Sequence, residues 1–146
     1  MRYLADDACT FDGTIATDTA VSIGDFVIAT DTVGIQPVST QATVAEALAG
    51  FAGVALQDKP AGIDQIRGNS RPGRIRIATA GVWEATCTDA LEIGDALTFH
   101  QGADTVAAQA VAKVAEDEGA IGIALAAKDA GAGVARFRLF VKRMAP

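Results

Sequence analysis

The sequence is poor in aromatic residues: its 146 residues include six Phe, one Trp and one Tyr. Such rings commonly line sites for sugars and small apolar ligands. Their scarcity argues against a ligand- or carbohydrate-binding β module (a surface adhesion domain), which stays open as the alternative function. A core of Val, Ile, Leu and Ala with few rings predicts closely packed sheets without a roomy cavity.

Residues that carry catalysis or bind metals are also scarce. The two cysteines, Cys9 and Cys87, make neither a disulfide framework nor a metal-binding spacing. His100 is the single histidine, and no serine, cysteine or acid stands at a known catalytic spacing from it. The contiguous acids at 116–118 point in different directions on a short helix and indicate a solvated surface. The glycine-rich stretches lack the Lys-Ser/Thr pair of a phosphate loop. We therefore expect no enzymatic activity, no cofactor and no metal.

The chain also lacks an excess of basic residues and any long hydrophobic run. Its formal net charge of −6 argues against nucleic acid as a partner, because phosphate binding needs a basic surface. Residues 1–60 hold eight acids and two bases, whereas residues 61–146 hold ten of each. No apolar run approaches the roughly 20 residues that cross a bilayer, and no signal-peptide pattern opens the chain. We expect no membrane partner, no secretion, and synthesis in a reducing cytoplasm.

What the chain does contain is a set of short phrases that occur twice in the same order. They are Ala20-Val21-Ser22-Ile23-Gly24-Asp25 and Ala90-Leu91-Glu92-Ile93-Gly94-Asp95, Gly53-Val54-Ala55-Leu56 and Gly122-Ile123-Ala124-Leu125, and Arg74-Ile75-Arg76-Ile77 and Arg136-Phe137-Arg138-Leu139. The second copies follow the first by seventy, sixty-nine and sixty-two residues. A nearly constant offset predicts an internal duplication over about residues 20–85 and 90–143.

Short β-prone runs alternate with turn residues along the chain, which is typical of an all-β barrel or sandwich. The predicted fold is a compact all-β barrel or sandwich built from two duplicated halves, with one or two short helices. Residues 20–146 form a single β domain, and residues 1–19 form an extended N-terminal arm in which 10–17 fit a strand. We expect the other strands at residues 26–30, 35–40, 51–56, 74–78, 80–85, 96–100, 121–126 and 135–142.

Three residues predict local geometry within these strands and turns. Gly24 indicates a tight turn that leads into a strand, because glycine adopts positive φ at little steric cost. Pro37 indicates the edge of a sheet, since proline has no N–H to donate to a neighbouring strand. Gly53 indicates a place where a neighbouring strand approaches closely.

Helical segments are expected in two places. Thr43 and Glu46 fit a capping box at the start of a short helix over residues 45–49, with the Glu side chain reaching back to the cap amide. Residues 105–118 fit either one Ala-rich helix or a strand over 105–111 followed by a short helix. Comparison with the first copy favours the strand followed by a short helix over about 112–118.

Four arginines alternate with apolar residues on two predicted strands. Arg74 and Arg76 project to one face of their strand, and Arg136 and Arg138 project to one face of theirs. One interpretation is an ordinary solvated face, on which the arginine stems cover apolar surface. The other is an electrostatic strip that docks on an acidic surface, such as the acidic half of a neighbouring copy.

The ordered motifs resemble a family of small capsid-decoration (cement) proteins encoded among the structural genes of tailed bacteriophages. The resemblance covers about residues 20–142. It rests on Ile23-Gly24-Asp25, Gly53-Val54-Ala55-Leu56, Gly81-Val82-Trp83, Leu91-Glu92-Ile93-Gly94-Asp95, Gly122-Ile123-Ala124-Leu125 and Arg136-Phe137-Arg138-Leu139. The loop Lys59–Gly73 and the N-terminal arm are longer than the family pattern.

The resemblance implies a non-enzymatic structural protein of the virion. Such a protein binds the outer surface of the capsid and stabilises the shell by bridging subunits of the major capsid protein. It is often a homotrimer at local threefold positions, so the implied partners are the major capsid protein and further copies of the chain. It offers no catalytic residue to transfer. We expect partner contacts from Tyr3, Leu4, Phe11, Arg74, Arg76, Arg136 and Arg138.

Overall fold

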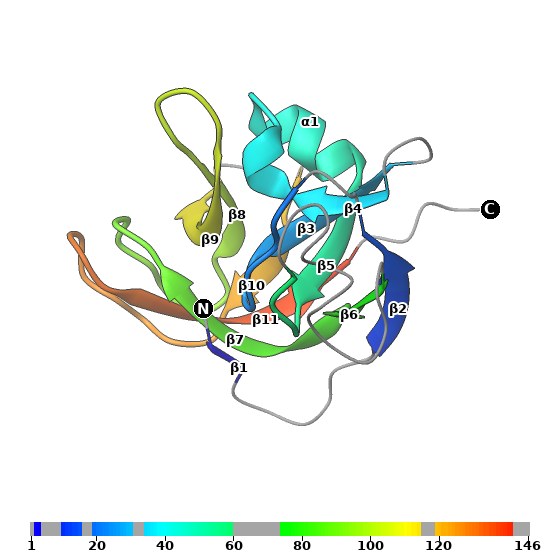
Figure 1. Cartoon of the computed structure of the whole chain (residues 1–146). Coiled ribbons are helices and arrows are strands. Elements are labelled where there is room, and N and C mark those ends of the chain that lie inside the picture. Colours follow the sequence, from blue (N-terminus) through cyan, green and yellow to red (C-terminus); the bar gives the residue numbers. More distant parts are fainter. Residues whose placement is uncertain are drawn as a thin grey trace.

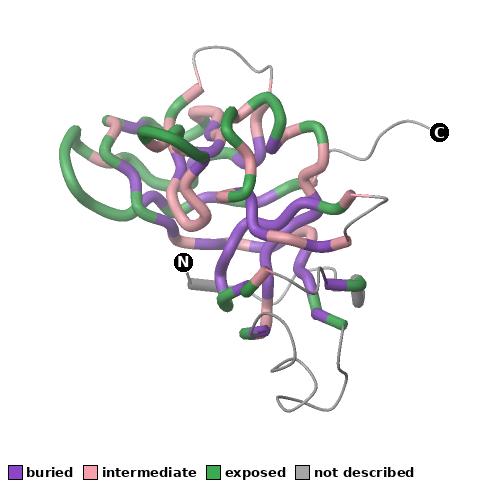
Figure 2. The backbone as a smooth tube through the Cα atoms, turned by 45° about the horizontal axis from the view of Figure 1, so that its top comes forward, coloured by how far each residue is buried: buried purple, intermediate pink, exposed green. Residues whose placement is uncertain are grey.

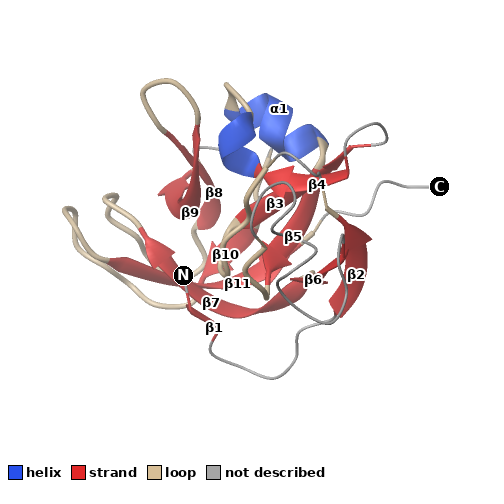
Figure 3. Cartoon of the chain, viewed as in Figure 1, coloured by secondary structure: helices blue, strands red, loops and turns tan. Residues whose placement is uncertain are grey.

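The computed structural model describes residues 2–3, 10–15, 19–30, 34–59, 74–114 and 119–141. At residues 2–3 and 10–13 it describes the backbone alone. Its elements are β1 (Arg2–Tyr3), β2 (Thr10–Thr14), β3 (Phe26–Thr30), β4 (Gly34–Pro37), the 3₁₀ turn η1 (Val38–Thr40), α1 (Val44–Ala49), β5 (Phe51–Ala55), β6 (Arg74–Ala78), β7 (Ala80–Thr86), β8 (Ala96–Gln101), β9 (Val106–Lys113), β10 (Gly122–Ala124) and β11 (Val134–Phe140). Figure 3 shows strands throughout the described fold, with α1 at one end. The predicted all-β class with short helices is confirmed.

The strands form two largely antiparallel sheets, each of which curls on itself (Figure 1). The six-stranded sheet has the order β1-β7-β11-β10-β8-β9, and the five-stranded sheet has the order β2-β6-β5-β3-β4. In the first sheet β7 also meets β9 in parallel, at Thr86 and Ala110. In the second sheet the residue after β2, Ile15, meets Ile35 of β4 in parallel. Each sheet is therefore curled far enough to bring two of its distant strands together, as in a small barrel.

The two sheets have the same order of strands when β2–β6 are matched with β7–β11 along the chain. We call β2–β6 the first half and β7–β11 the second half. These sets begin at residues 10 and 80, whereas the sequence phrases placed the repeats at 20–85 and 90–143. The structural match starts earlier because it includes β2 and β7, whose sequences have no obvious phrase in common.

The strand register matches the two arginine phrases differently from the sequence alignment. The N–H of Leu56 donates to the carbonyl of Arg76, and the N–H of the corresponding Leu125 donates to the carbonyl of Arg136. Arg76 therefore corresponds to Arg136, whereas the sequence phrase aligned Arg74 with it. That alignment was wrong by two residues, because an alternating strand keeps its pattern of faces after a two-residue shift.

Both Gly-Asp turns have the same local geometry. Gly24 and Gly94 have φ values of 91° and 96°, a conformation that favours glycine. In each turn the aspartate Oδ2 accepts the backbone N–H three residues earlier, at 2.9 Å for Asp25 and 2.8 Å for Asp95. The turn predicted at Gly24 is confirmed, and the aspartate holds it closed through its side chain.

The larger hydrophobic cluster lies between the two sheets. Phe26 of β3 is fully buried, and its ring centroid lies 5.2 Å from that of Phe99 and 6.5 Å from that of Phe137, both in the six-stranded sheet. A second cluster, which includes Val27 and Ile77, belongs to the five-stranded sheet. Figure 2 shows the buried residues gathered mainly in the middle of the molecule. Two clusters occur because β3 buries the consecutive residues 26–28, and hence both of its faces.

Two predicted elements differ from the structure. The strand expected at 35–40 ends at Pro37, and residues 38–40 form η1. β4 is the last strand of its sheet, which confirms the edge position predicted from the proline. β9 continues to Lys113 because it pairs with β8 there, so the short helix expected to follow residue 111 does not start at 112. Residues 115–118 lie outside the described residues.

Part of the predicted N-terminal arm belongs to the sheets. β1 pairs with β7, and β2 pairs with β6 along all five of its residues. Residues 4–9 and 16–18 of the arm lie outside the described residues, as do residues 60–73 of the predicted long loop. β2 supplies an end strand of the five-stranded sheet, so residues 10–14 are part of the domain.

The helix α1 starts at the predicted cap. Thr43 Oγ1 accepts the N–H of Glu46 at 3.3 Å, and the Glu46 carboxylate accepts the N–H of Ala42 at 3.2 Å, one residue before the expected cap amide. The N–H of Val44 donates to the side-chain oxygen of Gln101 at 3.1 Å. Because Gln101 ends β8, this bond attaches the start of α1 to the six-stranded sheet.

Candidate partner-binding surface

The four arginines singled out in the sequence lie on the exposed sides of their strands. Arg74 and Arg76 belong to β6 of the five-stranded sheet, and Arg136 and Arg138 belong to β11 of the six-stranded sheet. The residues between them are buried in both strands, so the predicted alternation is confirmed. The two pairs are not neighbours within one sheet. Their role as an electrostatic strip stays a prediction.

Acidic and basic positions stand side by side in both sheets. Arg136 Nη2 lies 3.2 Å from Glu84 Oε1, and the two side chains are 54% and 20% exposed. Such a solvent-facing pair contributes about 0–1 kcal/mol. Arg2 also pairs in register with Glu84, and the matching row of the five-stranded sheet joins Asp12 with Arg76. Glu84 therefore balances part of the arginine charge on the six-stranded sheet.

The remaining residues predicted to contact partners belong to the N-terminal arm. Tyr3 pairs in register with Trp83 on β7, and Phe11 pairs with Ile77 on β6. Leu4 lies outside the described residues. The backbone positions of Tyr3 and Phe11 are thus on two different sheets, and their contacts with partners stay predictions.

The structure adds an exposed apolar surface that the sequence analysis did not identify. Ile123 is 41% exposed, Leu125 37%, Val134 53% and Phe140 38%. Large apolar side chains gathered on one exposed face commonly mark interaction sites. We call this surface the β10–β11 face; its members are Ile123, Leu125, Val134, Arg136, Arg138 and Phe140. The alternation of Val134 to Phe140 was a usable signal, but a sequence does not show which face of a strand stays uncovered.

The register places apolar residues beside arginines on this face. Ile123 pairs with Arg138, and Leu125 is bonded to the carbonyl of Arg136 at 2.9 Å. Side chains at directly opposite positions of an antiparallel pair lie on the same side of the sheet. The arginine stems therefore extend the apolar surface, while their guanidinium groups give it positive charge.

One end of the β10–β11 face opens into an apolar groove of about 620 Å³. The groove lies between the end of α1 and the six-stranded sheet. Its lining includes Leu48, Phe51, Ala96, Ile121, Ile123 and Phe140. A smaller hollow of about 330 Å³ lies at the other end of the face, beside Val134 and Arg136. The groove is large enough to receive a large apolar side chain from a partner.

The described residues also form a polar hollow of about 570 Å³, lined in part by Glu92, Lys113 and Lys128. They contain no group of three or more His, Cys, Asp or Glu placed to hold a metal ion, and no helix of theirs has the length and apolarity to cross a membrane. Trp83 is 2% exposed, and its Nε1 donates to the carbonyl of Ala80 at 3.2 Å. Of the aromatic side chains that the structure describes, Phe140 is the exposed one. A sugar-binding platform of several exposed rings is not found among them.

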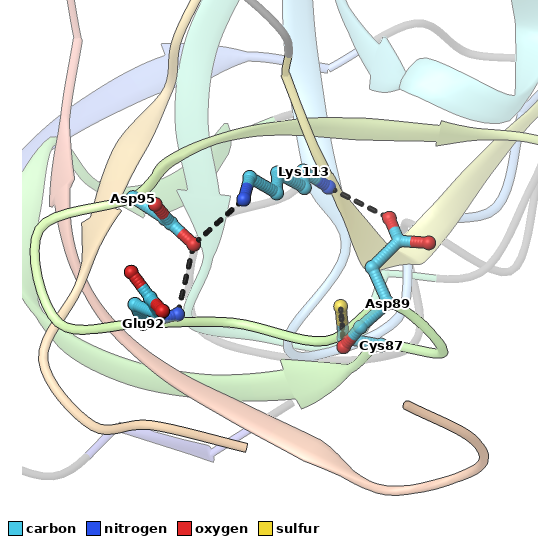
Figure 4. A network of polar contacts seen from close by, with 5 residues as sticks. All are labelled: Cys87, Asp89, Glu92, Asp95 and Lys113. Carbon is cyan, nitrogen blue, oxygen red and sulfur yellow. Dashed lines mark hydrogen bonds and ion pairs between the residues drawn. The ribbon is translucent and has the colours of Figure 1, made fainter. Parts of the chain in front are cut away.

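A polar network supports the second Gly-Asp turn (Figure 4). Lys113 Nζ lies 3.2 Å from Asp95 Oδ2, which also accepts the N–H of Glu92 at 2.8 Å. The backbone N–H of Lys113 donates to Asp89 Oδ2 at 2.8 Å. The thiol of Cys87 is free and buried, and it points to the carbonyl of Asp89 at 4.0 Å. The network ties the end of β9 to the turn before β8.

This network predicts a pH-dependent contribution to stability. The pKa of Asp95 lies below its usual value of 3.8, first because the N–H of Glu92 binds the carboxylate and then because Lys113 does. The ionised carboxylate therefore stabilises the fold above that usual value, and the contribution is lost as the pH falls through the lower folded-state value. We expect Asp95→Asn to lower the free energy of unfolding in urea at pH 6 and to have less effect at pH 3.

The control for this experiment is Asp104→Asn, which changes an exposed acid in the loop after β8. It should alter the unfolding free energy little at either pH. An equal effect of Asp95→Asn at pH 6 and pH 3 would show that the carboxylate charge does not stabilise the turn.

Comparison with known proteins places the fold. No protein-family model and no curated protein matches the sequence. The structure is similar to the crystal structure of the N base of the head fiber gp8.5 in bacteriophage phi29, with a TM-score of 0.50. The match covers 95% of this chain and 99% of that chain, at 14% sequence identity. At this identity the likeness concerns the fold.

Proposed function

We propose that the protein is a structural component of a tailed-bacteriophage head. It binds the outer surface of the capsid shell and stabilises the shell by bridging subunits of the major capsid protein. The observation that carries the proposal is the fold similarity to the phi29 head fiber base, which covers 95% of this chain and 99% of the other. The resemblance of the sequence motifs to capsid-decoration proteins supports the same class of function on separate grounds.

The surface of the molecule supports binding more than chemistry. The β10–β11 face combines four exposed apolar side chains with two arginines and opens into a groove. A capsid presents many identical sites, so a protein that bridges two subunits gains from multivalency even when each contact is weak. In this proposal the protein needs no catalytic group.

We further propose that the chain is an internal duplication and that its copies act as homotrimers on the virion surface. The duplication is supported by the shared strand order of the two sheets and by the shared geometry of the two Gly-Asp turns. The trimer follows from the family resemblance. Tyr3, Leu4 and Phe11, with Arg74 and Arg76, remain proposed contacts to the capsid or to sister copies.

The function is tested by binding to capsid shells. We expect the purified protein to co-sediment with undecorated shells of the phage that encodes it, and to saturate them at a fixed number of copies per shell. Shells that already carry the protein are the control and should take up little more. Sedimentation that does not saturate, or that is equal for bare and decorated shells, would contradict the proposal.

A further inference from the structure

The two halves of the chain use the same face of their sheets differently. Phe26 pairs with Val54 in the first half, and Ala96 pairs with Ile123 at the corresponding place in the second half. Phe26 and Val54 are fully buried in the cluster between the sheets. Ile123, in contrast, is 41% exposed, and both it and Ala96 line the groove. The face that packs the first half against the second is therefore uncovered in the second half.

A third position shows the same contrast. Val54 pairs with Ala78 in the first half, and Ile123 pairs with Arg138 in the second. Ala78 is fully buried, whereas Arg138 is exposed. Where the first half has the ring of Phe26, the second half has the methyl group of Ala96. Where the first half has the methyl group of Ala78, the second half has the guanidinium group of Arg138. The first exchange opens the groove, and the second sets a positive charge beside it.

These exchanges define the chemistry of the occupant. A groove with apolar walls accepts an apolar side chain, and an arginine beside it pairs well with a carboxylate. A second copy docked through the same face would bring Arg136 and Arg138 of the two copies together, because a twofold interface joins identical patches. Charge complementarity therefore disfavours a twofold dimer through this face and favours an occupant that carries an acidic group next to an apolar one. In the proposed function that occupant is a capsid subunit.

We infer that the β10–β11 face and its groove form the capsid-binding site. The groove takes one large apolar side chain of a capsid subunit, and Arg138 pairs with a carboxylate next to that side chain. This inference rests on the proposed function and deepens it by naming the contact surface. In such a site the buried apolar anchor supplies most of the affinity, while the charge pair sets the orientation.

Two variants test the groove and the charge separately. Ala96→Phe introduces the ring that the first half has at the matching position, so it fills the groove without changing the charge. Arg138→Glu reverses the charge beside the groove. Ile23→Glu is the matched control, because Ile23 is 57% exposed and lies on the Gly-Asp turn of the first half, outside the groove lining. Circular dichroism and urea unfolding establish that each variant is folded.

Co-sedimentation with undecorated shells gives the result. We expect both test variants to bind about tenfold or more weakly than the wild type, and Ile23→Glu to bind as the wild type does. If Ala96→Phe does not fold, the shell binding of Arg138→Glu tests the inference. If the wild type and all folded variants saturate the shells equally, the inference is wrong and the proposed function stands.

Two other outcomes would also overturn the inference. If the wild type does not bind shells, the proposed function fails and the inference fails with it. The second outcome is measured by gel filtration of the same proteins. If the wild type self-associates, Ala96→Phe abolishes that association, and shell binding is unchanged, then the occupant of the groove is a second copy.

Discussion

Replacing Gly53 by alanine is expected to lower the free energy of unfolding by about 3–5 kcal/mol. Gly53 has a φ of +144°, which residues with a side chain rarely adopt. A Cβ at this position would lie 2.2 Å from the carbonyl oxygen of Ala78 and 2.8 Å from Cγ2 of Ile77. The variant must therefore strain its own backbone and push β5 away from β6, and both costs act together.

Two other glycines separate these costs. Gly94 has a φ of +96°, and a Cβ there would meet no atom within 4 Å, so Gly94→Ala should lose only the backbone cost, about 1–2 kcal/mol. At Gly122, which corresponds to Gly53, a Cβ would lie 2.7 Å from Cδ2 of Phe137 and 2.8 Å from the carbonyl oxygen of Arg138. Gly122→Ala should lose about 1–3 kcal/mol through crowding. Urea unfolding followed by circular dichroism measures all three, and equal losses at Gly53 and Gly94 would contradict the crowding argument.

Replacing Phe26 by alanine is expected to cost about 3–5 kcal/mol. The Phe26 ring is fully buried and makes edge contacts with two other rings, at centroid distances of 5.2 Å to Phe99 and 6.0 Å to Phe51. Phe99 belongs to the six-stranded sheet and Phe26 to the five-stranded sheet. The substitution therefore leaves a cavity at the junction of the two sheets.

Phe140→Ala is the control for this prediction, because Phe140 is the same residue type but is 38% exposed. It should cost about 1 kcal/mol, since less apolar surface returns to water. Unfolding in urea is followed by the fluorescence of the buried Trp83 in β7 and by the circular dichroism of the whole protein. A loss at Phe26 no larger than that at Phe140 would show that the ring does not hold the sheets together.

Local features of the fold were predictable where neighbouring residues in the chain determine them. The turn at Gly24, the cap at Thr43 and the edge position of Pro37 each depend on a few adjacent residues, and the structure confirms them. The close approach at Gly53 was predicted from a glycine inside an apolar strand, and the lack of room for a Cβ beside the carbonyl oxygen of Ala78 confirms it. These signals needed no knowledge of the partner strands.

Register and long-range pairing were harder to predict. The arginine phrase was aligned two residues away from its structural match, because alternation repeats every second residue and leaves such a shift undetected. Lys113 was placed in a short helix, yet it extends β9 because the pairing with Leu97 of β8 outweighs the helical preference of an Ala-rich segment.

The sequence by itself determined the all-β class, the main turns and most strand positions, because these follow from alternation, glycine and proline. Tertiary structure alone decided which sheet faces are covered. Val54 and Ile123 occupy matching places in similar strands, but one is fully buried and the other is 41% exposed. The difference arises because the first half packs this face against the second half. Among the described residues, no further sheet covers the corresponding face of the second half.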